Sequence, residues 1–138
     1  MRRVAAALVH YPVYDRQREV VTSAITNLDL HDIARSSLTY GLSDLFIVHP
    51  VAAQRLLAER VREHWISGSG ARRIPDRTPA ISILRIVTTL DEALSALGPG
   101  AELWVTSASG SGDLLDFPAG RERLALDGPP VLIVFGTG

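Results

Sequence analysis

The residues of this sequence that could do chemistry gather in short polar turns, each directly after an apolar run. Histidine opens two of the turns, and Ser, Thr and Gly make up the other two. Glycine and small residues after a buried strand let backbone amides approach a ligand closely, as in many sites for nucleotide-like molecules. We therefore predict a ligand site built from the turns His10-Tyr11-Pro12, His49-Pro50, Thr106-Ser107-Ala108 and Gly136-Thr137-Gly138.

A second polar group lies at residues 27–35. If this segment is helical, His31 and Arg35 are four residues apart and Asp32 and Arg35 three, so the spacing predicts one polar patch on a face distinct from the apolar stripe. Asp32 or His31 could accept a proton, whereas a guanidinium with a pKa above about 12 is suited to orienting a phosphate. The alternative for Asp32 and Arg35 is an ordinary intrahelical ion pair worth about 0.3–0.5 kcal/mol.

Several other kinds of site are disfavoured. The chain has no Cys, and its His, Asp and Glu residues lack metal-ligand spacing, so we predict no metal site. Neither the dinucleotide fingerprint nor a Gly-Lys-Ser/Thr phosphate loop occurs, which argues against dehydrogenases and nucleotidases. For His10, His49 and His64 we favour core or capping hydrogen bonds over metal ligation.

The elements that must position these residues follow from the hydrophobic pattern. Almost continuous apolar runs predict strands covered on both faces, at residues 4–9, 45–48, 83–87, 103–105 and 131–135. Helical patterns lie between them, with Thr89 opening a capping box and a short helix expected within 117–126. The sequence thus predicts a parallel α/β sheet with helices on both faces, whose strands end at a common rim.

The two long helical patterns have distinct signals. The first carries Leu30, Ile33, Ala34, Ser37 and Leu38 at helical spacing, with Asn27 or Asp29 as cap and Gly41 as stop. The second, 51–66, is expected to bury Ala53, Leu57, Val61 and Trp65 and to expose Arg55, Glu59 and Arg62.

Composition sets wider limits. A chain of 138 residues suits one domain, and a net charge of −1 gives no global basic footprint for nucleic acid. All 14 basic residues are Arg, which suits phosphate recognition but equally reflects genomic base composition. No run approaches the roughly 20 apolar residues of a membrane span, and we expect a cytoplasmic protein.

Blocks spread over the whole chain resemble the bacterial RNA methyltransferase family of the knotted SPOUT superfamily. The most specific block runs from Asn27 to Arg35 within residues 25–35. The others, in the family's order, are His10-Tyr11-Pro12-Val13, Thr39-Tyr40-Gly41, Gln54-Arg55 with Glu63-His64-Trp65, Pro75-Asp76-Arg77, Val105-Thr106-Ser107-Ala108 and Phe135-Gly136-Thr137-Gly138.

This resemblance implies S-adenosylmethionine as cofactor, an RNA substrate such as tRNA or rRNA, and a homodimer. By similarity, residues 106–108 and 136–138 would lie along the cofactor, and Asn27 and Arg35 would face the RNA or the partner subunit. Arg35 and Asp32 are then the catalytic candidates, and His10, Asn27 and His31 the substrate-binding candidates.

The sequence also departs from the family pattern. Ile74 stands where relatives tend to have Asn. In the family, the Gly-Thr-Gly turn leads into a helix and a segment that passes through the trefoil knot, whereas this sequence stops at Gly138. We therefore expect a fragment rather than a degraded member, and we expect methyltransferase activity and the homodimer only in the complete form. The alternative function is a non-catalytic α/β binding or dimerisation module that lost the cofactor half.

Overall fold

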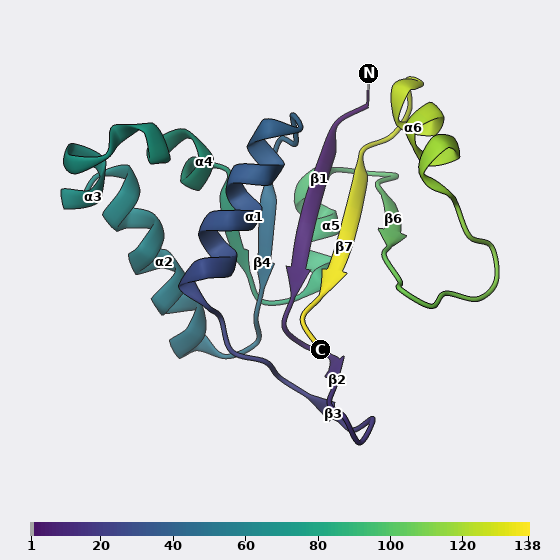
Figure 1. The fold of residues 1–138 in the computed structure, drawn as a ribbon, viewed down its shortest axis with the longest axis horizontal. Coiled ribbons are helices and arrows are strands. Elements are labelled where there is room, and N and C mark those ends of the chain that lie inside the picture. Colours follow the sequence, from purple (N-terminus) through teal and green to yellow (C-terminus); the bar gives the residue numbers. More distant parts are fainter. Residues whose placement is uncertain (1) are drawn as a thin grey trace.

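The computed structural model describes residues 2–138, which form a five-stranded sheet with helices on both faces (Figure 1). All neighbouring strands are parallel, in the order β5-β4-β1-β7-β6. The five predicted strands are confirmed to within one residue at each end, and so is the fold class. The strands are β1 (Val4–Val9), β4 (Leu45–Val48), β5 (Leu84–Val87), β6 (Glu102–Val105) and β7 (Val131–Gly136).

Helices fill the crossovers between the strands. They are α1 (Asn27–Thr39), α2 (Ala52–Ile66), α3 (Ser69–Arg73), the 3-10 turn η1 (Pro75–Arg77), α4 (Thr78–Ser82), α5 (Leu90–Leu97) and α6 (Phe117–Ala125). Two short strands, β2 (Val13–Tyr14) and β3 (Val20–Val21), form an antiparallel hairpin. Within residues 2–138, none of the helices is long and apolar enough to cross a membrane.

Two apolar layers hold the sheet. Alternate residues of β1 face opposite sides of the sheet. Ala6 and Leu8 pack with α1, α2 and α4. Ala5, Ala7 and Val9 pack with α5. Figure 1 shows α1 on one side of the sheet and α5 on the other. This double coverage explains why the strands read as continuous apolar runs in the sequence.

Side-chain caps open α1, α5 and α6, the last through Asp116. The cap of α1 is Thr26, and neither Asn27 nor Asp29 as expected; its hydroxyl accepts a hydrogen bond from the Asp29 amide. Thr89 accepts from the Glu92 amide, and Glu92 in turn accepts from the Thr88 amide, so the predicted capping box forms with its return bond shifted by one residue.

The predicted buried face of α2 is half right: Val61 and Trp65 pack against the core, whereas Ala53 and Leu57 are exposed. Leu57 is 46% exposed, whereas the fully buried residue of this helix is Ala58. Arg55 and Arg62, expected in solvent, are half-buried because their guanidinium groups donate to the carbonyls of His49 and Pro50 and of Leu84, respectively. The face that α2 packs against the sheet therefore differs from its predicted apolar stripe, because these hydrogen bonds fix the helix against the ends of the strands.

Candidate functional site

The carboxyl ends of β1, β4, β6 and β7 meet at one edge of the sheet, which we call the carboxyl rim. It comprises His10, His49, Thr106, Gly136 and Thr137. The Thr106 amide donates to the Val134 carbonyl at 3.1 Å, and the Thr137 amide donates to the Val9 carbonyl at 3.3 Å. The prediction that the turns at 106–108 and 136–138 lie on the same rim is confirmed.

Ser23, on the segment between β3 and α1, ties this rim together. Its amide donates to the His10 carbonyl at 2.9 Å, and its own carbonyl lies 2.8 Å from Nε2 of His49. Its hydroxyl is hydrogen-bonded to the hydroxyl of Thr137. Since the Thr137 hydroxyl also bonds to the Val9 carbonyl, which can only accept, Ser23 is the donor in the hydroxyl pair. One residue thus joins the ends of three strands.

The hydrogen bonds also fix the tautomers of the two rim histidines. His49 Nδ1 accepts from the Val51 amide at 3.1 Å, so Nε2 carries the proton that it donates to Ser23. His10 Nδ1 lies 3.3 Å from the Val48 carbonyl and is therefore the protonated nitrogen of that ring. The rings lie with their centroids 5.3 Å apart. Both histidines donate to backbone carbonyls, as the core hydrogen-bonding interpretation predicts.

His10 Nε2 is left as a buried acceptor without a hydrogen-bond partner among the described residues. Its side chain is completely covered. Burial, together with the neighbouring His49, lowers the pKa of His10. An unpaired buried acceptor costs about 1–3 kcal/mol, so a donor that reached this nitrogen would be stabilised.

The three residues of the turn Gly136-Thr137-Gly138 lie in different environments. A Cβ on Gly136 would meet no atom within 4 Å, so this glycine borders open space. Thr137 is held by Val9 and Ser23. A Cβ on Gly138 would lie 2.6 Å from the Tyr14 carbonyl oxygen, because the turn packs closely on the β2–β3 hairpin (Figure 1).

The turn at 106–108 follows β6, the strand next to β7. The Thr106 hydroxyl donates to the Val134 carbonyl at 2.8 Å, which fixes the start of the turn, and Ser107 and Ala108 are exposed. The boundary between β1 and β7 joins strands from opposite ends of the chain, and such points of open parallel sheets are where ligands bind. Gly136 and Thr137 lie at that boundary.

The polar residues of α1 form a separate group. Asn27 lies in its first turn, close to the rim, whereas Arg35 is eight residues further and hence about 12 Å along the helix. Asp32 and Arg35 are exposed, and no ion pair joins them in the described part of the chain. The structure therefore does not bring Arg35 and Asp32 beside the Gly-Thr-Gly turn of the same chain.

The expected position of His31 on this polar face is wrong. Its side chain is only 7% exposed, and its ring packs edge-on against Trp65 at 5.3 Å between centroids. Arg77 stacks over the same indole at 5.1 Å. Burial, and the positive charges of Arg77 and Arg35, lower the pKa of His31. His31 turns inward because Leu30 and Ala34 beside it form the buried face of α1.

Three residues that hold the rim or the segment beside it were missed by sequence reasoning. They are Ser23, Gln54, whose side-chain carbonyl accepts from the Ile25 amide at 2.8 Å, and Arg55. Gln54 and Arg55 belong to one of the matched sequence blocks, which was a usable signal; Ser23 carried none. Among residues 2–138 no group of three or more His, Asp or Glu side chains could hold a metal ion.

Comparison with known proteins gives the family. The family described as SAM-dependent RNA methyltransferase matches residues 3–138. Two proteins named tRNA (guanine-N(1)-)-methyltransferase are similar: that of Oleidesulfovibrio alaskensis is 39% identical over 140 residues, and that of Nitratidesulfovibrio vulgaris is 40% identical over 141. Each match covers 99% of this chain and 32% of the relative, so the chain spans about a third of their length.

Two further matches concern a shorter relative and the fold. An uncharacterised Aquifex aeolicus protein is 32% identical, over 98% of this chain and 68% of its own. A crystal structure of a methylase family protein from Neisseria gonorrhoeae superposes with a TM-score of 0.53 at 22% identity, covering 98% of this chain and 62% of that one, which supports the fold. From the match over residues 3–138, the chain belongs to the SAM-dependent RNA methyltransferase family.

Proposed function

We propose that this protein methylates tRNA with S-adenosylmethionine and that the carboxyl rim is where the cofactor binds. The observation that carries the proposal is the open region at Gly136, on the boundary of β1 and β7 and beside the turn that begins at Thr106. The ring nitrogen N1 of guanine is the proposed acceptor, on the strength of the names of two relatives about 40% identical to this chain.

The residues of the rim fit such a cofactor. Gly136 leaves room for a ligand against the backbone, Ser107 and Ala108 are exposed, and His10 Nε2 is a buried acceptor without a partner. When bound, S-adenosylmethionine supplies an electrophilic methyl group on a sulfonium. The role of residues 106–108 and 136–138 is to bind and orient this ligand and to exclude water from it.

Methylation of guanine N1 also requires that the N1 proton be removed. Nitrogen forms a bond to the methyl carbon, the bond from that carbon to sulfur breaks, and a base takes the proton. We assign that base to Asp32 and the orientation of an RNA phosphate to Arg35, since both side chains are exposed on one side of α1. Asn27, which is exposed, is proposed to contact the substrate, whereas the completely covered His10 is proposed to support the rim from beneath. His31 is proposed to position α1 through its contact with Trp65, rather than to touch the RNA.

The distance of Asp32 and Arg35 from Gly136 leads to a second part of the proposal, a homodimer. Because Arg35 lies about 12 Å along α1 from Asn27, it is better placed to act on a neighbouring protomer's rim than on its own. We therefore propose a homodimer in which α1 of one protomer faces the RNA bound to the other. From the sequence blocks around residues 25–35 and 135–138, we also propose that the protein in its complete form belongs to the SPOUT superfamily and has its knot. We propose a cytoplasmic location as well.

The experiment that tests the cofactor site is a calorimetric titration of the natural protein and of Gly136→Val with S-adenosylmethionine. The Cβ of the new side chain would meet no protein atom within 4 Å and would occupy the open region. Cofactor binding should therefore weaken tenfold or more, which corresponds to about 1.4 kcal/mol, while thermal unfolding stays unchanged. Gly120→Ala on α6 is the control. Equal affinity in the natural protein and Gly136→Val would reject the site, and no binding by either would favour the alternative of a non-catalytic module.

The proposed role of Arg35 is tested separately. Arg35→Ala should lower methyl transfer to tRNA at least tenfold, measured with labelled cofactor, and leave cofactor affinity unchanged, because Arg35 lies away from Gly136 along α1. Arg121→Ala, at an exposed arginine of α6, is the matched control. Unchanged turnover in Arg35→Ala would leave this arginine as an ordinary surface residue.

A further inference from the structure

The charges of this chain are unevenly distributed, although its net charge is only −1. Residues 52–77, from α2 to η1, contain six arginines and three carboxylates. Residues 102–127, from β6 to just beyond α6, contain five carboxylates and two arginines. Figure 1 shows α2 and α3 at one end of the molecule and α6 at the opposite end. The molecule therefore has a basic end and an acidic end.

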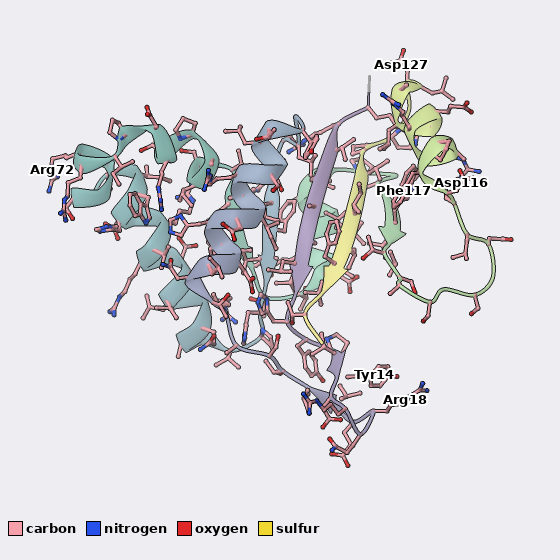
Figure 2. The ribbon with its side chains drawn as sticks, in the orientation of Figure 1. Tyr14, Arg18, Arg72, Asp116, Phe117 and Asp127 are labelled. Carbon is pink, nitrogen blue, oxygen red and sulfur yellow. The ribbon has the colours of Figure 1, made fainter. Side chains whose placement is uncertain are left out.

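Three arginines at the basic end are free to meet a partner. Arg60, Arg72 and Arg73 are exposed and form no ion pair within the described residues, and we call them the arginine corner. Figure 2 shows Arg72 at the outer end of the molecule, with Asp116 on the opposite side. The other arginines of this segment serve the fold: Arg55 and Arg62 donate to backbone carbonyls, and Arg77 stacks on Trp65.

The corner is held rigidly by two glycines. A Cβ on Gly68 would lie 2.9 Å from the His64 backbone, and one on Gly70 would lie 2.7 Å from the Trp65 ring. Only glycine therefore allows α3 to fold back closely onto the end of α2. An open hollow of about 290 Å³ lies beside this junction, lined by Arg60, Glu63, His64, Ser67 and Gly68. The guanidinium groups of the arginine corner therefore extend from two helices, α2 and α3, that pack against each other.

We propose that the arginine corner binds the phosphate backbone of the RNA substrate, as an anchor remote from the site of methyl transfer. Guanidinium groups match phosphate oxygens in bidentate geometry, and a chain of net charge near zero needs such a local basic surface to bind RNA. Arg72 and Arg73 lie beyond the far end of α2, whose 15 residues span about 22 Å from the side of the carboxyl rim. The arginine corner therefore acts on RNA affinity and not on the reacting atoms. The inference rests on the proposed RNA methyltransferase function.

The test compares two double variants of the natural protein. Arg72→Gln/Arg73→Gln removes two charges from the corner, and Arg121→Gln/Arg123→Gln removes two from exposed positions of α6, at the acidic end. Binding of a fluorescent unmodified tRNA transcript is measured by anisotropy at a series of NaCl concentrations. Loss of two phosphate contacts should lower the slope of log affinity against log salt by about 1.4–1.8 in the first variant alone. The KM for tRNA should rise while kcat is kept.

Each outcome is decisive. Equal weakening in both variants would mean a general charge effect and would overturn the corner, as would unchanged binding by Arg72→Gln/Arg73→Gln. Calorimetric titration with S-adenosylmethionine keeps the two proposals apart. If the cofactor binds and the tRNA affinity does not change in the corner variant, the proposed RNA-binding surface is rejected and the proposed methyltransferase function is retained. If the cofactor does not bind, the proposed function fails, and tRNA binding alone still supports or rejects the corner.

Discussion

Ser23 and His10 show how single residues of this chain connect separate strands. Ser23 uses its amide, carbonyl and hydroxyl on three different partners, and the imidazole of His10 is completely buried beside that of His49. A buried neutral imidazole opposes protonation, because the charged form would lose its hydration and repel its neighbour. The rim should therefore be sensitive to acid.

Lowering the pH is expected to reduce the free energy of unfolding through His10. Its pKa is lowered in the folded state, so below about 6.5 the unfolded chain binds a proton that the folded chain does not. Stability should fall by up to about 1.4 kcal/mol per pH unit from this group as the pH decreases below that value. His10→Asn keeps a donor for the Val48 carbonyl and cannot titrate, so it should flatten the dependence.

Urea unfolding at pH 7.5, 6.5 and 5.5 measures the effect. The natural protein should lose stability over this series more steeply than His10→Asn, with His31 supplying the dependence that remains, since its pKa is also lowered. Parallel pH profiles for the two proteins would show that His10 does not carry the sensitivity.

At the scale of elements, side chains anchored to backbone carbonyls decide how α2 sits. Arg55 donates hydrogen bonds to the turn after β4, and Arg62 donates one to the Leu84 carbonyl at the start of β5. These bonds place the two arginines on the side of the helix that faces the sheet. The return from α2 into α3 then depends on backbone contact at Gly68 and Gly70. Helix packing here is governed by close approach as much as by apolar burial.

Gly68→Ala should destabilise the protein by about 1–3 kcal/mol, since the new methyl group would press on the His64 backbone, which cannot rotate away. Gly120→Ala is the contrasting variant. Its Cβ would sit 3.6 Å from Leu115, an ordinary contact, and alanine favours a helix by about 0.5–1 kcal/mol over glycine. Chemical denaturation should thus shift in opposite directions for the two, and a shift in the same direction would contradict this account.

At the scale of the molecule, the sheet is covered unevenly. The half around β1, β4 and β5 is packed between α1, α2 and α4 on one face and α5 on the other. On the half around β6, Leu103, Val105 and Phe135 are 43%, 70% and 41% exposed, and α6 has no buried residue. Figure 2 shows Phe117 at the start of that helix, where it is 95% exposed. Exposed apolar surface of this kind favours association.

Phe117→Ser is expected to change the free energy of unfolding by no more than about 0.5 kcal/mol, because the ring contributes no burial to the fold. Self-association at high concentration, measured by light scattering, should decrease. Phe46→Ser is the contrasting variant: its ring is fully buried in the sheet, so stability should fall strongly. A large loss of stability in Phe117→Ser would mean that α6 packs more closely than described.

The sequence by itself determined the five strands, the parallel α/β class and the common rim of the turns at 106–108 and 136–138. Doubly covered strands must be apolar along their whole length, and Thr89 and Gly98 mark the start and end of α5 through local hydrogen bonding. The family was also readable, because the block at residues 25–35 and the shorter blocks keep their order along the chain.

Only the tertiary structure decided the rotation of α2, the inward position of His31 and the role of Ser23. Each depends on a partner distant in sequence: Arg62 on Leu84, His31 on Trp65, and Ser23 on Thr137, 114 residues away. Helical periodicity reports which residues share a face, but not which face the rest of the chain covers. A hydroxyl in a loop carries no signal of its partner until the strands bring the two together.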